Sequence, residues 1–179
     1  MNDAAVLAVI VAVRGLVPLL IFRWNLAGAL LAIAADGSDA IIQDVLGAEP
    51  LRGCYHEFDK VFDTYYLTIE LGVALRWGDP VARWMLAGLF ALRLLGIAVF
   101  ELTGAREVIL FAPNVFENYY LVLAGLRSIR PGYRLRGWGE AVLWLAAVTP
   151  PKVLQEYVMH YREAQTWHFV RDEIFTPWN

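Results

Sequence analysis

Two pairs of aspartates are the residues of this chain best suited to chemistry. Asp36 and Asp39 are three residues apart, Asp59 and Asp63 are four residues apart, and both pairs lie within or beside apolar stretches. On a helix, either spacing places both carboxylates of a pair on one face. Two such helices packed face to face would bring four negative charges together, and these charges repel one another unless cations bind between them.

Hard divalent cations such as Mg²⁺ and Mn²⁺ prefer carboxylate oxygens as ligands. Two of these ions could polarise a pyrophosphate and stabilise a leaving nucleotide while a nearby carboxylate accepts the proton of an alcohol. We therefore expect Asp36, Asp39 and Asp59 to be metal ligands, and Asp63 to be a ligand or the catalytic general base. No residue is assigned to substrate binding.

Five other polar residues have simpler explanations than catalysis. Asp44 is a further ligand or, as we favour, a solvated residue at a helix end; His56 is a ligand or, again favoured, a loop residue at the depth of the lipid headgroups. Glu70 is better explained by a polar contact to Arg14 or Arg93. These two arginines lie inside apolar stretches, where they most simply neutralise buried carboxylates.

Composition indicates the environment of these residues. Hydrophobic residues make up 59% of the 179 residues, charged residues 18%, and the mean hydropathy is +0.48. This balance is typical of integral membrane proteins rather than soluble domains. A net charge of -3 argues against a nucleic-acid partner, which requires a basic surface. We expect a multi-pass protein whose partners are the lipid bilayer and a lipid or nucleotide-linked substrate.

About six apolar stretches have roughly the ~20 residues that a helix needs to span a bilayer. We expect an all-α fold, a bundle of about six transmembrane helices in a single transmembrane domain over 1–179, followed by an amphipathic tail at 160–179. The first stretch is read as a transmembrane helix, with a cleaved signal peptide as the alternative. The expected helices are 4–22, 25–46, 58–77, 81–102, 107–126 and 138–157.

Two features of these stretches remain open. Pro113 and the pair Pro150–Pro151 interrupt the fifth and sixth stretches, which are therefore expected to be kinked, re-entrant or partly interfacial. Lys and Arg residues outside the helices divide seven against six between the two sides, which sets no orientation. The arginines of 127–136 alone would place their own side in the cytoplasm and the aspartates outside.

The aspartate pattern resembles that of the CDP-alcohol phosphatidyltransferases, whose signature is D-x2-D-G-x2-A-R-x8-G-x3-D-x3-D across the second and third of six transmembrane helices. The matching segments here run from Asp36 to Asp44 and from Phe58 to Asp63, and Arg14 and Pro18 are similar to an Arg and a Pro common in that family's first helix. The resemblance implies metal-dependent transfer of a phosphoryl-linked group from a CDP-linked donor to an alcohol in lipid synthesis. It also implies two Mg²⁺ or Mn²⁺ ions and a homodimer.

The chain departs from the signature at three residues. Ala40 replaces the Gly, Gln43 and Asp44 replace Ala-Arg, and the gap between the two pairs is two residues longer. An arginine at 44 would attract a nucleotide diphosphate, whereas an aspartate repels it. These changes indicate a divergent member with a different donor, or a relative that has lost the reaction.

Three classes of function therefore remain. The first is the phosphatidyltransferase-like enzyme, and the second is a non-catalytic membrane protein of the same fold that binds metal or lipid or serves as a subunit of a complex. The third is another aspartate-rich transferase resembling the UbiA prenyltransferases, whose roughly nine helices need a longer chain. The sequence identifies neither donor nor acceptor.

Overall fold

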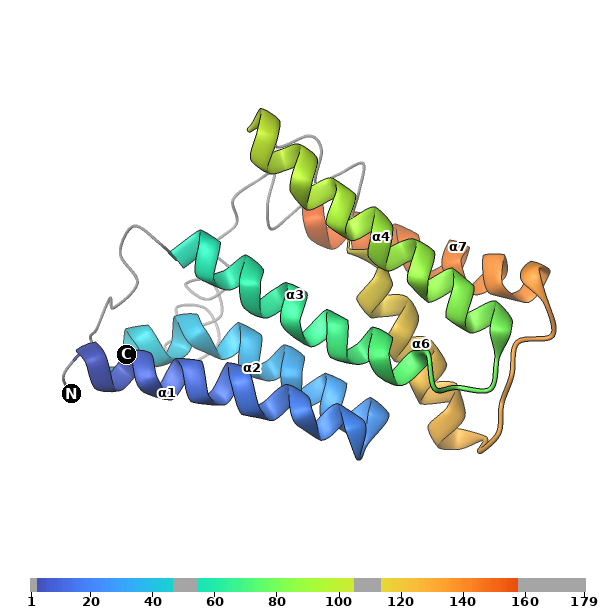
Figure 1. Cartoon of the computed structure of the whole chain (residues 1–179), viewed down its shortest axis with the longest axis horizontal. Helices are drawn as coiled ribbons and strands as arrows, with labels where there is room; N and C mark the ends of the chain where they lie inside the picture. Colours follow the sequence, from blue (N-terminus) through green and yellow to red (C-terminus); the bar gives the residue numbers. More distant parts are fainter. Residues whose placement is uncertain (1–2, 47–54, 105–113, 158–179) are drawn as a thin grey trace, which may run out of the picture. The chain divides into compact units, whose positions relative to one another are not determined.

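The computed structural model describes residues 3–46, 55–104 and 114–157, and within these ranges it contains helices and no strand. Side chains are described for 5–38, 60–104, 114–155 and 157. The elements, shown in Figure 1, are α1 (Asp3–Leu16), the 3-10 helix η1 (Val17–Phe22), α2 (Asn25–Leu46), α3 (Tyr55–Ala74), α4 (Pro80–Thr103), α6 (Val115–Ile129) and α7 (Trp138–Glu156). The expected all-α class is confirmed for the described residues.

The residues group into two compact units, and α6 is divided between them. The first unit comprises Met1–Gly78 and Tyr120–Tyr133, and the second comprises Asp79–Tyr119 and Arg134–Asn179. Each unit combines segments that are distant in sequence. The expectation of a single transmembrane domain stays a prediction.

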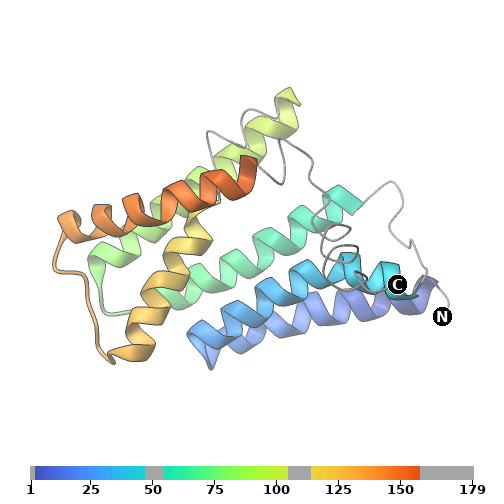
Figure 2. The same ribbon diagram turned by 180° about the vertical axis from the view of Figure 1, so that it is seen from behind.

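In the first unit, α1 and η1 pack antiparallel against α2, and α3 packs against both (Figures 1 and 2). Pro18 lies in the first turn of η1 and has no N–H to continue the α-helical bonding, so the chain tightens into a 3-10 helix there. Gly28 allows the close contact between α2 and η1, because a Cβ at this position would lie 2.6 Å from Ile21 Cα. The buried apolar side chains between these helices include Val6, Ile10, Ile21, Ala32 and Leu67.

In the second unit, α4 and α7 lie side by side and run in the same direction (Figures 1 and 2). Asp79 caps α4, because its Oδ1 accepts a hydrogen bond from the Ala82 N–H at 3.1 Å. Its Oδ2 also accepts from the Leu135 N–H at 2.8 Å, which ties the start of α4 to the segment before α7. At the other end of α4, Gly104 adopts a φ of 66°, a left-handed conformation that favours glycine.

Most expected helix boundaries agree with the structure. The helix α2 has the expected bounds. The helix α4 is one residue longer than expected at each end, and α7 ends one residue earlier than expected. By contrast, α3 begins and ends three residues early, because Arg76 N–H and Trp77 N–H bond to Val73 O and Ala74 O in tight turns. The helix α7 continues through Pro150–Pro151. The described part of the expected helix 107–126 is α6, which begins only at Val115 and ends three residues later than expected, at Ile129. Residues 107–113 and the tail 160–179 lie outside the described residues.

Two described segments, Ala5–Phe22 and Pro80–Thr103, are long and apolar enough to cross a membrane by length and composition. They support membrane association at that coarse level. A helix of 15 residues such as α6 is about 22 Å long, which is shorter than the ~30 Å hydrocarbon core. Polar residues interrupt the apolar character of α3, which contains Lys60, Asp63 and Glu70.

Candidate carboxylate site

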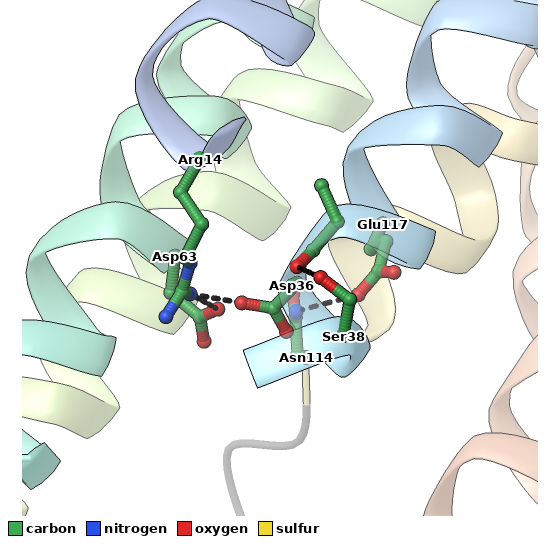
Figure 3. Close-up of polar contacts among 7 residues, drawn as sticks. Arg14, Asp36, Ser38, Asp63, Asn114 and Glu117 are labelled. Atoms are coloured by element: carbon green, nitrogen blue, oxygen red, sulfur yellow. Dashed lines mark hydrogen bonds and ion pairs between the residues drawn. The ribbon is translucent and has the colours of Figure 1, made fainter. Parts of the chain in front are cut away.

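Arg14 is the centre of the polar cluster in the first unit. The residue is 3% exposed, and its Nη2 forms an ion pair with Asp36 Oδ1 (Figure 3). The same nitrogen lies 3.8 Å from Asp63 Oδ1. Three helices therefore each contribute one charged side chain to one point, with Arg14 from α1, Asp36 from α2 and Asp63 from α3.

Aromatic residues of α3 fix the position of this arginine. The Arg14 guanidinium carbon lies 5.2 Å from the centre of the Phe62 ring, within the range of a cation–π interaction. Phe62 in turn meets Tyr65 edge to face, with ring centres 6.4 Å apart. The Tyr65 hydroxyl donates a hydrogen bond of 2.9 Å to the backbone carbonyl of Gly15, next to Arg14.

Asp39 and Asp59, the other members of the two pairs, lie within α2 and α3, but their side chains fall outside the described residues. Asp39 lies nearer than Asp36 to the C-terminal end of α2, and Asp59 lies nearer than Asp63 to the N-terminal end of α3. These two helix ends are joined by the connection between α2 and α3. Because the two helices are antiparallel neighbours, Asp39 and Asp59 are displaced toward the same end of the unit, by about 4.5 and 6 Å. The convergence of all four carboxylates stays a prediction.

The two described carboxylates are the type of ligand that a hard cation prefers. Asp36 and Asp63 offer carboxylate oxygens and retain side-chain exposures of 31% and 19%, so an ion could reach them. Arg14 supplies one positive charge against these two negative ones, which leaves the trio with a charge of −1. Among the described residues no group of three His, Cys, Asp or Glu side chains gathers, and the expected ligands Asp39 and Asp59 are outside that set.

The other acidic and histidine candidates from the sequence lie either outside the described side chains or farther along α3. The side chains of Asp44 and His56 lie outside the described residues. Glu70 is fully buried on α3, about ten ångströms along the helix from Asp63. Arg14 pairs with carboxylates as expected, with Asp36 as its ion-pair partner and Asp63 3.8 Å away, but both carboxylates are part-exposed rather than buried.

Sequence reasoning missed the two aromatic residues that hold the cluster. Phe62 is adjacent to Asp63, and Tyr65 follows three residues later, so both lie near the carboxylate on α3. An aromatic pair at helical spacing beside an acidic residue was the available signal. It could not identify Gly15 or Arg14 as the groups contacted, since both are on another helix.

Comparison of the chain with protein-family models, with curated proteins and with solved structures finds no match.

Proposed function

We propose that this chain is a divergent membrane transferase of the CDP-alcohol phosphatidyltransferase type, which moves a phosphoryl-linked group from a nucleotide-activated donor to an alcohol in lipid synthesis. One observation carries the proposal. Asp36 and Asp63, from different helices and different pairs, approach the same nitrogen of Arg14. A divalent-metal site of this kind requires that meeting of α2 and α3.

Charge supports a role for divalent cations in this proposal. The two pairs together carry four carboxylates, and Arg14 alone offsets only one of the four charges. Two Mg²⁺ or Mn²⁺ ions held by Asp36, Asp39, Asp59 and Asp63 would more than offset the remaining negative charge, and the net positive charge would attract and polarise a pyrophosphate when bound. Asp63 keeps a second role in the proposal, as the base that accepts the proton of the alcohol.

Membrane placement supports a lipid substrate. The apolar segments Ala5–Phe22 and Pro80–Thr103 bring the chain into the bilayer, and we propose that the remaining helices complete a multi-pass bundle of about six spans. A homodimer is the proposed assembly. An acceptor or donor with acyl chains would then reach the carboxylates from within the membrane.

The test uses the full chain purified in detergent and returned to lipid. With a CDP-linked lipid donor and a panel of small alcohols, we expect release of CMP that requires Mg²⁺ or Mn²⁺ and ceases in the Asp63→Asn variant. Glu101→Gln is the matched control, since it removes one negative charge from an exposed residue of α4. Loss of activity in both variants, or CMP release without divalent ions, contradicts the proposal.

A second function has its own supporting observation. Because Arg14 already forms an ion pair with Asp36 and lies near Asp63, the cluster also suits a purely structural link between three helices. The corresponding protein would keep the fold as a non-catalytic lipid-binding or complex subunit. In that case the chain binds neither Mn²⁺ nor CDP-linked lipid, which equilibrium binding of both ligands to the parent protein distinguishes.

A further inference from the structure

The first unit carries a second cluster, formed by arginines that lie over aromatic rings. The pairs are Arg23 with Trp24, Arg76 with Phe22 and Arg127 with Trp77, with 5.9, 5.4 and 4.4 Å between guanidinium carbon and ring centre. These six residues are called the arginine–aromatic cluster below. Arg23 precedes Asp36 by 13 residues, and Arg76 follows Asp63 by 13 residues, so the cluster lies about 20 Å along the helices from the aspartates.

Trp77 anchors this cluster. Its ring is buried and stacks on Tyr120, with ring centres 5.2 Å apart and an interplanar angle of 21°. With its oxygen turned toward Trp77, the Asn25 side-chain amide accepts a hydrogen bond from Trp77 Nε1 at 3.2 Å and donates one to Ile21 O at 3.1 Å. The start of α2, the end of α3 and α6 are therefore joined beneath the arginines.

Charge is strongly separated between the two ends of this unit. Segments 17–30, 71–78 and 120–133, which form the cluster end, contain four arginines and no acidic residue, whereas the described segments 36–46 and 55–63 contain six acidic residues and one lysine. Arg23 and Arg76 are exposed and form no salt bridge within the described residues. These two arginines therefore present positive charge at the surface of the cluster end.

The position of the cluster in the chain indicates the depth of a bilayer surface. The apolar segment Ala5–Phe22 ends one residue before Arg23, and Pro80–Thr103 begins four residues after Arg76. Phe22 and Trp24 remain 49% and 54% exposed, as is typical of aromatic side chains at the level of the lipid headgroups. Arginine forks also match the oxygens of phosphate groups.

We propose that the arginine–aromatic cluster binds the phosphate groups of anionic phospholipids at one face of the bilayer. The arginines contact the phosphates, and the half-exposed rings lie between the headgroups and the acyl chains. This inference uses none of the aspartates. It is therefore independent of the proposed transferase activity and can fail or succeed separately.

The test titrates phosphatidylglycerol or phosphatidylcholine into the full chain, purified in uncharged detergent, and measures the thermal unfolding midpoint. We expect phosphatidylglycerol to raise the midpoint and phosphatidylcholine to leave it unchanged. An arginine near an anionic surface contributes about fivefold in affinity. The double variant Arg23→Gln, Arg76→Gln should therefore require roughly 25-fold more phosphatidylglycerol for the same increase.

Two further variants make the result specific. Arg134→Gln, Arg136→Gln removes the same charge from two exposed arginines that lie over no ring among the described residues, and should respond to phosphatidylglycerol as the parent does. Arg23→Lys, Arg76→Lys keeps the charge without the planar fork and should lose less than the glutamine variant. An equal loss in the Arg134, Arg136 control, an equal response to phosphatidylcholine, or the same increase with single-stranded RNA would overturn the proposal.

Discussion

The hydroxyl of Tyr65 donates a hydrogen bond to the backbone carbonyl of Gly15, fifty residues earlier in the chain. This contact joins α3 to α1 one residue beyond Arg14. Phe62, which contacts Tyr65 edge to face, packs against the Arg14 guanidinium. The Phe62 ring and the Tyr65 hydroxyl together determine where Arg14 meets the carboxylates.

Tyr65→Phe should weaken the folded state modestly. The substitution removes the hydroxyl and keeps the ring, so the expected loss in free energy of unfolding is about 1 kcal/mol, with up to about 2 kcal/mol more if the Gly15 carbonyl finds no water. Denaturant unfolding of the purified protein measures this loss. Tyr65→Leu should lower the free energy of unfolding further, since it also removes the aromatic ring that meets Phe62 edge to face. Equal stability of parent and Tyr65→Phe contradicts the role given to the hydroxyl.

Arg14→Gln should destabilise the first unit through its two carboxylates. Leaving a fully buried partner without its counter-charge costs about 3–5 kcal/mol, and we expect about 2–3 kcal/mol here, because Asp36 and Asp63 retain some exposure to solvent. Adding Asp36→Asn to this variant should restore part of the loss, and a double-mutant cycle of unfolding free energies measures the coupling. Strict additivity would mean that the ion pair contributes nothing to stability.

The same Arg14→Gln variant reports on metal binding. If divalent ions bind between the carboxylates, Mg²⁺ or Mn²⁺ at millimolar concentration should raise its unfolding midpoint more than that of the parent, since the ion replaces the missing positive charge. Ca²⁺ and a monovalent salt at equal ionic strength are the controls. An identical response of parent and variant to all of these salts counts against the metal site.

Gly28→Ala should destabilise the α2 and η1 contact. The added methyl group would lie 2.6 Å from Ile21 Cα and Leu20 C, both backbone atoms that cannot rotate away, so we expect a loss of about 1–3 kcal/mol. Gly37→Ala is the matched control on the same helix, because no atom lies within 4 Å of its added methyl. The control should be neutral or gain roughly 0.5–1 kcal/mol from helix propensity. The free energies of unfolding of the two variants should therefore change in opposite directions or differ from each other by more than about 1 kcal/mol.

Asp44→Arg tests the departure from the transferase signature. Replacing a carboxylate by a guanidinium exchanges repulsion for attraction toward a nucleotide diphosphate, so affinity for CDP-linked lipid should increase about tenfold or more. Ala40→Gly in the same protein restores the glycine of the signature, which would let a substrate approach the backbone more closely. Binding of the donor is measured by calorimetry, with Arg134→Gln as a control remote in sequence. No binding in parent or variant would favour the non-catalytic protein.

Long apolar helices were predictable, and local breaks in them were less so. The bounds of α2 follow from its apolar run between Asn25 and Leu46. The change from α1 to η1 depends on Pro18, which the apolar pattern reads as a continuation of the same helix. The early end of α3 depends on backbone turns at Arg76 and Trp77, which carry no mark in hydropathy.

For the candidate site, sequence spacing identified the aspartates and the neutralising role of Arg14. It did not pair Arg14 with Asp36 and Asp63, because Glu70 was an equally suitable partner for Arg14, and Arg93 an equally suitable arginine. Long-range contacts such as Tyr65 to Gly15 are invisible to a helical period, which relates residues three or four apart. The structure supplies that pairing through the antiparallel arrangement of α1 and α2 and the packing of α3 against both.

The passage of α7 through Pro150–Pro151 has a mechanical consequence. Neither proline has an N–H, so the carbonyls of Ala146 and Ala147, four residues earlier, receive no helical hydrogen bond. Thr149 already uses its hydroxyl on the carbonyl of Leu145 and offers these two no relief. The middle of α7 is therefore the part of the helix that bends at the lowest energetic cost, so the angle between its two halves can change without loss of further hydrogen bonds.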